Sequence, residues 1–400
     1  MSATTIHQRF CLILGVLIET RWTHVLQCFV SEDLDDKALD EGAFSKETLR
    51  KFHVRHGLPP DFLADFWAAK SSFFLPKIQQ GGHHVIRKDD LLPISFENPD
   101  KPLGKGAHGT VYGASLIPGL HWSSKTHTRI AVKKFDEAKV RTHEYKMIRK
   151  FDAHPYILPA LCSIDHGSSY YILFPRGKMS LRQRFQYEDC NSSPAEFLKH
   201  YVGLLDALGH LHKEEPAAWN CHFDIKTSNI LIKYDGKFVL IDFGTSYSKI
   251  KFHAQDSGTE AQRHSHSAEY KAPESGKIGR KFDVWAIACI GLELLVWIDE
   301  GWKGVRSFAK SRRGDMPRDG GISDRTPYFY VDGKHAPSVQ SMLGKLGQKY
   351  PEEIKILRRM LKIDPNDRFT AEMACLRFRE CVNVSFLIMV WYSKPYLDRH

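Results

Sequence analysis

Residues able to do acid-base chemistry gather in one short stretch of the chain, between residues 221 and 232. Asp224 is followed by Lys226 and Asn229, and an Asp-Phe-Gly tripeptide begins at Asp242. A carboxylate, a cation and an amide oxygen at these offsets suit a site that holds metal-bound phosphates beside a hydroxyl nucleophile. Asp and Asn also favour turns, so each of these residues taken alone fits an ordinary loop.

A glycine-rich motif lies upstream of this stretch. A G-x-G-x-x-G-x-V match begins at Gly104 and ends at Val111. Glycine lets the backbone approach phosphates closely. Dinucleotide-binding folds use the same spacing but need a helix directly after the glycines, whereas residues 111–115 have the composition of a strand. The context therefore predicts a glycine-rich hairpin over a nucleotide, and a plain turn is the alternative for the glycines in isolation.

A lysine and a glutamate follow the glycine motif. Lys133 ends an apolar run, where a fixed cation could hold the α- and β-phosphates of a nucleotide. Glu144 lies in an amphipathic segment that follows and could orient that lysine. A lysine at a strand end is usually just exposed to solvent, so the order of these residues after the glycine motif is what makes the pair distinctive.

The segments before the glycine motif are predicted to be helical. Apolar residues recur at helical spacing over residues 6–30, over 46–56 and again from Phe62 to Leu75. The acidic segment 31–41 is interpreted as a solvated loop, because it lacks the glycine and ligand spacing of a calcium loop. Gly81-Gly82 and the polar residues up to Asp90 predict a linker.

From Leu91 short β-branched and aromatic runs predict a sheet. The expected strands and the one long helix among them are residues 109–112, 129–133, 157–164 and 170–174, with the helix between Asp136 and Phe151. Beyond residue 177 helices dominate, and a helix with one apolar face is expected over residues 197–211. The boundary between a sheet-rich lobe and a helical lobe is therefore placed near residue 176.

Composition limits the class of protein. The 400 residues are 42% hydrophobic, enough for a sizeable core, and the formal charge is +10 with a pI near 9.0. Nucleic-acid binding is not favoured, since no Lys/Arg run or aromatic-basic repeat accompanies the charge. The eight cysteines show no C-x-x-C pair, which indicates a reducing compartment, and we expect an intracellular, cytoplasmic or nuclear protein that is neither secreted nor membrane-bound.

In their order along the chain, these motifs resemble those of the eukaryotic protein kinases. The resemblance spans roughly Leu91 to Cys381 and adds an H-F-D-x-K-x-x-N loop at His222 and an Ala-Pro-Glu tripeptide at Ala272. It implies an α+β, two-lobe kinase fold: a small, mostly antiparallel sheet lobe, then a helical lobe. The implied domains are a helical extension over 1–90, a kinase domain over 91–382 with lobes 91–176 and 177–382, and an unassigned tail over 383–400.

The resemblance implies a role for each motif residue. Asp224 would accept the proton of a substrate hydroxyl, Lys226 would neutralise charge on the transferring phosphoryl group, and Asn229 and Asp242 would hold Mg²⁺. Lys133 and Glu144 would complete the catalytic set. The residues matching the family's ATP pocket and hinge are Gly104, Lys105, Gly106, Gly109, Val111, Ala131, Lys133, Phe174 and Arg176. Lys226 and Ser267 match the serine/threonine class, so the implied substrates are proteins bearing Ser or Thr; the oligomeric state is left open.

Supporting roles follow from the same resemblance. Glu274 and Arg368 would form a buried ion pair at the end of the activation segment, because a lone buried charge is costly. Asp283 would hold the backbone of the catalytic loop, and His222 and Phe243 would pack in the core that aligns the lobes.

Two features depart from the family pattern. Phe223 stands where an arginine usually precedes the catalytic aspartate, and a phenyl ring cannot pair with a phosphorylated activation-loop residue. Activity is therefore expected without activation-loop phosphorylation. The long activation segment also contains His253, His264 and His266, which are interpreted as surface histidines rather than a metal cluster.

The helical extension and the segment 292–305 are similar to filamentous-fungal serine/threonine kinases with a helical N-terminal extension. The expected function is transfer of the ATP γ-phosphoryl group to Ser/Thr hydroxyls of proteins. The alternative is a pseudokinase, an ATP-binding or scaffolding module, which the complete set of catalytic residues disfavours. Small-molecule phosphotransfer is disfavoured by the Ala-Pro-Glu motif and by substrate-loop residues that fit peptide binding.

Overall fold

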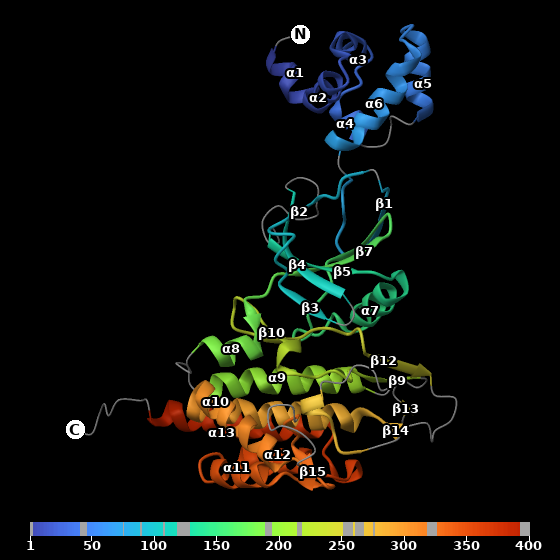
Figure 1. Ribbon diagram of the computed structural model, residues 1–400. Coiled ribbons are helices and arrows are strands. Elements are labelled where there is room, and N and C mark those ends of the chain that lie inside the picture. Colours follow the sequence, from blue (N-terminus) through green and yellow to red (C-terminus); the bar gives the residue numbers. More distant parts are fainter. Residues whose placement is uncertain are drawn as a thin grey trace, which may run out of the picture. The chain divides into compact units, whose positions relative to one another are not determined.

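The computed structural model describes residues 3–40, 46–74, 76–88, 90–106, 109–117, 129–188, 194–213, 218–250, 259–260, 268–274, 277–317 and 326–392 (Figure 1). The chain divides into two compact units. The first comprises Met1–Lys105, Gly109–Glu137 and Leu161–Leu173, and the second comprises Gly106–His108, Ala138–Ala160 and Phe174–His400. Among the described residues, no helix is both long and apolar enough to cross a membrane.

The chain begins with a small helical module that has its own apolar core. Its elements are α1 (Ala3–Arg9), α2 (Cys11–Glu19), η1 (Thr23–Val25), α3 (Leu26–Ser31), α4 (Asp36–Asp40), α5 (Lys46–Arg55) and α6 (Pro60–Phe73). The core is rich in aromatic side chains, with Phe29 stacked on Phe66 at 5.4 Å between ring centroids and Phe52 4.6 Å from Phe29. The predicted helices are confirmed, although the first apolar stretch is divided among four short elements.

The acidic segment of this module is more ordered than the solvated loop expected from the sequence. Arg9 forms ion pairs with Asp33 at 2.6 Å and Asp35 at 2.8 Å. The carboxylate of Asp36 accepts hydrogen bonds from the backbone N–H groups of Leu12 and Ile13, each at 2.9 Å, and so satisfies donors in the first turn of α2. The acidic residues therefore fasten the helices together.

A seven-stranded sheet carries the glycine motif and Lys133. Its strands are β1 (His83–Ile86), β2 (Ile94–Phe96), β3 (Gly104–Gly106), β4 (Gly109–Leu116), β5 (Arg129–Phe135), β6 (Cys162–His166) and β7 (Ser169–Pro175). The order is β1-β6-β7-β5-β4-β2, with β3 paired to β4. The pairs β2–β4, β4–β5 and β6–β7 are antiparallel, as expected from the sequence. Residues 157–161, expected in a strand, precede β6 instead.

Strand β1 corrects the predicted linker. His83–Ile86 pairs parallel with β6, and both Ile78 and Ile86 are buried in the apolar core of the sheet. The sequence pattern hides this strand because it is only four residues long and begins with two histidines. The sheet therefore begins before residue 91.

The remaining elements are mostly helical and form the second unit. They include α7 (Ala138–Phe151), α8 (Leu181–Tyr187), α9 (Pro194–His212), α10 (Arg280–Asp315), α11 (Pro337–Gly347), α12 (Pro351–Met360) and α13 (Ala371–Tyr392). Helix α10 is interrupted at Gly301, whose φ of 63° is non-helical. Short paired strands connect these helices: β8 (Met179–Ser180) with β10 (Ile230–Ile232) and β11 (Phe238–Leu240), β9 (Ala218–Cys221) with β12 (Tyr247–Ile250), β13 (Thr259–Glu260) with β14 (Lys277–Ile278), and β15 (Tyr330–Val331) with β16 (Lys334–His335).

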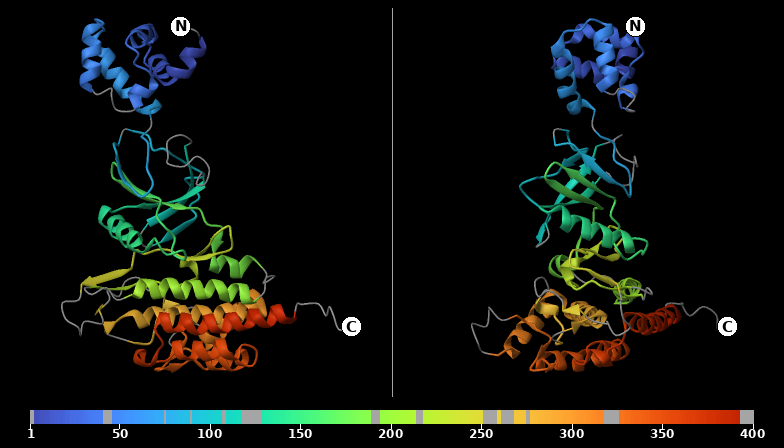
Figure 2. Two further views of the ribbon diagram at one scale, coloured as in Figure 1. Left: turned by 180° about the vertical axis from the view of Figure 1, so that it is seen from behind. Right: turned by 90° about the vertical axis from the view of Figure 1, so that its right-hand side faces the viewer.

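Helix α9 lies at the centre of this unit, beside α10 and α13 (Figure 2). Tyr201 of α9 donates a hydrogen bond to the carbonyl of Ile287 on α10 at 2.9 Å, and a Cβ at Gly291 would lie only 2.4 Å from the Tyr201 hydroxyl. Asp206 of α9 pairs with Arg379 of α13 at 2.8 Å. Helix α13 continues to Tyr392, through part of the tail that the sequence left unassigned; residues 393–400 lie outside the described part.

Candidate active site

The acid-base stretch forms a tight loop between β9 and β10. The Nζ atom of Lys226 lies 2.7 Å from Oδ2 of Asp224, and the Nδ2 atom of Asn229 donates to the same oxygen and to the backbone carbonyl of Asp224, each at 2.9 Å. Asp224 is buried, with 6% of its side chain exposed, while Lys226 is 27% exposed. The structure thus brings together three of the predicted catalytic and metal-binding residues, with the lysine nearer solvent.

These contacts orient the side chain of Asn229 for a metal. Both partners of its amide nitrogen are acceptors, so the donor end must face Asp224 and the amide oxygen is directed away. Amide and carboxylate oxygens are the ligands that hard divalent cations prefer. Asn229 also connects the two loops through its backbone, because its carbonyl accepts from the N–H of Ile241 at 3.0 Å, next to Asp242. The residues present therefore fit a hard divalent cation.

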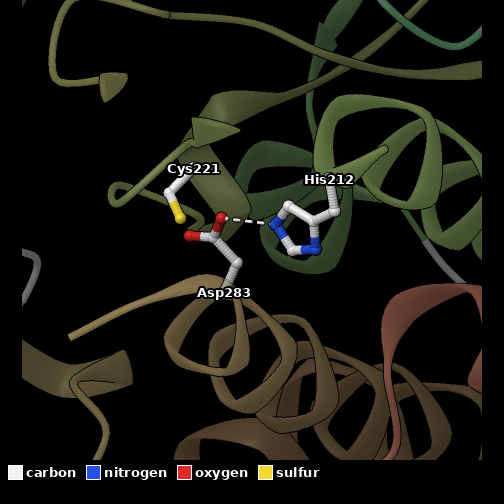
Figure 3. A group of neighbouring side chains, drawn as sticks. All are labelled: His212, Cys221 and Asp283. Atoms are coloured by element: carbon white, nitrogen blue, oxygen red, sulfur yellow. Dashed lines mark hydrogen bonds and ion pairs between the residues drawn. The ribbon is translucent and has the colours of Figure 1, made fainter. Parts of the chain in front are cut away.

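A buried aspartate at the start of α10 holds the loop from below. Oδ2 of Asp283 accepts from the backbone N–H of His222 at 2.8 Å, and Oδ1 accepts from that of Phe223 at 2.8 Å. Figure 3 shows His212 of α9 beside the same carboxylate, at 2.9 Å, together with Cys221. Burial opposes ionisation of Asp283, but the hydrogen bonds from His212 and the loop outweigh it and hold its pKa below the usual range. The expected support of the loop backbone is confirmed.

The same three side chains also have the composition of a small metal site, since His212, Cys221 and Asp283 place their ligand atoms within 4.8 Å of one another. The hydrogen bonds favour a structural role, because both oxygens of Asp283 are already occupied by N–H donors.

Phe223 is buried and adopts a left-handed backbone conformation. Its φ is 63°, only 3% of its surface is exposed, and its ring packs edge-on against Phe282 with the centroids 6.0 Å apart. A bulky residue rarely takes this conformation, which costs about 1–3 kcal/mol unless the surroundings enforce it. The hydrogen bond that its N–H donates to Asp283 and the apolar contact with Phe282 enforce it here. The side chain that replaces the usual arginine is thus part of the core.

The other expected supporting contacts in the second unit are also present. The rings of His222 and Phe243 lie 5.0 Å apart. Arg368 binds both carboxylate oxygens of Glu274, at 2.8 and 2.7 Å, and its guanidinium lies 5.0 Å from the ring of Trp285. A buried bidentate pair of this kind fixes geometry as well as charge.

The sheet residues that the sequence predicts to bind a nucleotide share one face. Val111 is the register partner of Lys133, and side chains opposite one another in antiparallel strands point to the same face. Ala131 lies two residues from Lys133 and so points the same way. Lys133 is 93% buried, and its Nζ lies 5.2 Å from the ring centroid of Phe135. The sheet therefore presents a cation beside two small apolar side chains, as an ATP-binding face requires.

The glycine motif falls on β3 and β4. Gly104, Lys105 and Gly106 are exposed on β3, and Gly109 begins β4. Gly109 has a φ of 146°, and a Cβ there would lie 2.2 Å from the backbone oxygen of Lys134. Strand pairing alone thus requires glycine at this position, whereas Gly104 is open and leaves room for a ligand.

Glu144, Phe174 and Arg176 belong to the second unit. Glu144 lies on α7 and is 99% buried, Phe174 lies near the end of β7, and Arg176 follows that strand. Asp242 begins the Asp-Phe-Gly motif with a φ of 66°, a second left-handed residue beside the loop. Ser267 and the three activation-segment histidines lie outside the described residues.

One polar network was not found by the sequence reasoning. Arg312 of α10 is fully buried; it pairs with Glu293 at 2.6 Å and Glu269 at 3.1 Å, and its guanidinium lies 3.8 Å from the ring centroid of Phe329. The hydroxyl of Tyr270 donates to Glu293 at 2.7 Å and lies 3.4 Å from the hydroxyl of Thr227, on η2 (Thr227–Asn229). No spacing in the sequence marks this set, because its members come from three separated segments.

The comparisons with known proteins agree with this geometry. The family description "Protein kinase domain" matches residues 98–377. A cyclin-dependent kinase D-1 from Arabidopsis thaliana is 24% identical over 68% of this chain and 68% of its own length, and the one from Oryza sativa subsp. indica is 25% identical over 68% and 63%. Serine/threonine-protein kinase KDX1 of Saccharomyces cerevisiae is 25% identical over 72% of this chain and 69% of its own.

Proposed function

The chain belongs to the protein kinase family and is an ATP-dependent serine/threonine protein kinase, and we propose the roles of its residues from the geometry above. The observation that carries the proposal is the cluster of Lys226 and Asn229 on the carboxylate of Asp224. The finer likeness to filamentous-fungal kinases stays a prediction.

We propose that Asp224 is the residue that receives the proton of the substrate hydroxyl. Its carboxylate is oriented by two donors, because the ammonium group of Lys226 and the side-chain amide of Asn229 both contact Oδ2. A base within hydrogen-bond reach of the nucleophile contributes about 10²–10⁴-fold to the rate. Lys226 remains partly exposed beside it, so its ammonium group can bind the transferring phosphoryl group as negative charge develops there.

Protein kinases use ATP and a divalent metal, and we propose Mg²⁺ as the metal here. Asn229 and Asp242 would hold it, and the ion would neutralise charge on the phosphates of the nucleotide. Lys133 would hold the phosphates from the sheet face shared with Val111 and Ala131, with Glu144 as its carboxylate partner. Gly104, Lys105, Gly106 and Gly109 would cover the phosphates, and Phe174 and Arg176 would flank the adenine ring.

The kinase domain itself is proposed to include β1. The strand at His83–Ile86 supports a start of this domain before the predicted boundary at residue 90, and the continuation of α13 to Tyr392 supports an end beyond the predicted boundary at 382.

The test is incorporation of radiolabelled phosphate from ATP into protein substrates of mixed composition. Wild type should label them, and Asp224→Asn should lower the rate at least about 100-fold, because the amide cannot accept the proton. Asp235→Asn is the matched control, since Asp235 is exposed in the turn after β10. Equal background labelling by wild type and Asp224→Asn would contradict the proposal and favour the alternative, a pseudokinase that acts as an ATP-binding or scaffolding module.

A further inference from the structure

A pocket of about 650 Å³ lies in the second unit beside the catalytic loop. It is lined by Thr227, three residues after Asp224, by Glu269 and Tyr270 of η3 (Ala268–Tyr270), and by α8 and the second half of α10. A segment bound there would lie next to the group proposed to receive the substrate proton. The pocket is therefore placed to contact residues that flank the phosphorylated Ser or Thr.

The pocket is lined by basic side chains from two helices: Arg182 of α8, and Lys303, Arg306, Lys310 and Arg313 of α10. The four on α10 are spaced by three, four and three residues, which places them along one face of the helix. Within the part of the chain that the structure describes, none of these five side chains forms an ion pair or hydrogen bond. Like charges at this spacing repel one another, so contacts within the described part of the chain do not account for the positive charge of this face.

The acidic residues of the pocket do not offset this charge. Glu293 and Glu269 both bind the buried guanidinium of Arg312, and Glu293 also accepts from Tyr270. A basic side chain of a ligand would have to displace a fully buried arginine to reach them. An acidic side chain, in contrast, meets unpaired cations at the pocket wall.

From this arrangement we propose that the pocket selects protein substrates with acidic residues near the phosphorylated Ser or Thr. The proposal rests on the proposed function and names the substrate class of the same site. Carboxylates of Asp or Glu and phosphates of previously phosphorylated residues share the required chemistry, since both accept charge-assisted hydrogen bonds from Lys and Arg. Trp302, Phe185 and Val305 add apolar surface to the same wall.

The experiment compares peptides that differ only in flanking charge. Each has one Ser with four Glu, four Gln or four Lys residues around it, and a fourth series replaces the Glu residues by phosphoserine. We expect kcat/KM for the Glu peptide to exceed that for the Gln peptide about tenfold, mainly through KM, and the advantage to shrink as NaCl is raised. The phosphoserine series distinguishes phosphate from carboxylate recognition.

Two charge-reversed variants decide whether the pocket is responsible. Arg306→Glu combined with Lys310→Glu should reduce the ratio of Glu-peptide to Gln-peptide kcat/KM about tenfold. Arg358→Glu, at an exposed arginine on α12, should leave it unchanged. If the double variant lowers the melting temperature, the milder Arg306→Gln and Lys310→Gln pair replaces it.

A separate binding measurement keeps this proposal distinct from the proposed function. Fluorescein-labelled peptides with Ala in place of Ser are titrated with the full-length protein, and the Glu peptide should bind about tenfold more tightly than the Gln peptide. Equal affinities, or an unaltered Glu preference in the double variant, would overturn the acidic preference while leaving phosphotransfer intact. Absence of phosphate transfer to every peptide would count against the proposed function, and binding would still decide the role of the pocket.

Discussion

The hydrogen bonds that Asp283 accepts from the catalytic loop allow a quantitative prediction. Asp283→Asn keeps the shape of the side chain but replaces one acceptor oxygen by an N–H donor. If the remaining oxygen stays on Phe223, the new amide nitrogen faces the backbone N–H of His222. A buried donor left without an acceptor costs about 1–3 kcal/mol. The ring of His212 can adopt its other tautomer and accept a hydrogen bond from the new amide. Only the backbone N–H of His222 therefore loses its acceptor.

The expected effect is measurable in both stability and activity. A loss of about 1–3 kcal/mol lowers the melting temperature by roughly 2–5 °C for a domain of this size. The loop that carries Asp224 is also less well held, so kcat should fall more than KM for ATP rises. Thermal unfolding measures the melting temperature, and steady-state kinetics at saturating peptide measure kcat and the KM for ATP.

A matched substitution controls for the general effect of losing a carboxylate. Asp367→Asn makes the same chemical change at an exposed position on η5 (Pro365–Asp367), and it should alter neither quantity. If Asp283→Asn unfolded at the wild-type temperature and kept the wild-type kcat, the conclusion that this carboxylate holds the loop would be wrong.

Three further predictions follow from other parts of the molecule. Burial raises the pKa of the Glu293 carboxyl group to about 7, so between pH 4.5 and 7 this group is protonated in the folded state but not in the unfolded state. Its contribution to the free energy of unfolding, up to about 3 kcal/mol, is fully present below pH 4.5 and is lost as pH rises to 7. The stability difference between wild type and Glu293→Gln, measured by denaturant unfolding, should therefore decrease over that range, and a constant difference would contradict it. Phosphatase treatment should leave the kinase activity unchanged, because Phe223 is buried against Phe282; a loss of activity that rephosphorylation reversed would show the opposite. Deleting residues 1–90 should destabilise the sheet, since it removes Ile78, Ile86 and β1, whereas deleting residues 1–75 should leave a soluble kinase; thermal unfolding of both truncations compares them, and equal stability would exclude a role for β1.

Much of the catalytic loop could be predicted from the sequence because its spacing is fixed by local geometry. Asp224, Lys226 and Asn229 are at most five residues apart, so one tight loop brings them together. The same holds for the strands around Lys133, where alternating burial produces a visible pattern. Short segments with mixed composition give no such pattern, so the sequence indicates a linker at His83–Ile86, where tertiary pairing with β6 makes β1 a strand.

The network around Arg312 was missed for a different reason. Its members are joined only by the fold, and an arginine in a polar helix has the same sequence signature whether it is buried or exposed. Burial becomes predictable only when the aromatic rings of Phe308 and Phe329 are known to lie on its guanidinium. The same applies to the unpaired cations on α10, because the net charge of the pocket that they line depends on which acidic residues are already paired with Arg312.

Phe223 connects the chemistry of the loop with its regulation. A left-handed phenylalanine is retained only where the gain from burying its ring and pairing its N–H exceeds the conformational cost, and both gains depend on residues of α10, Phe282 and Asp283. An arginine at this position could also pair its N–H with Asp283, but its guanidinium would then need an anion to leave water. The phenyl ring needs none, so the loop reaches its conformation through folding of the core alone. We therefore predict that the activity of this kinase does not depend on phosphorylation of the activation loop.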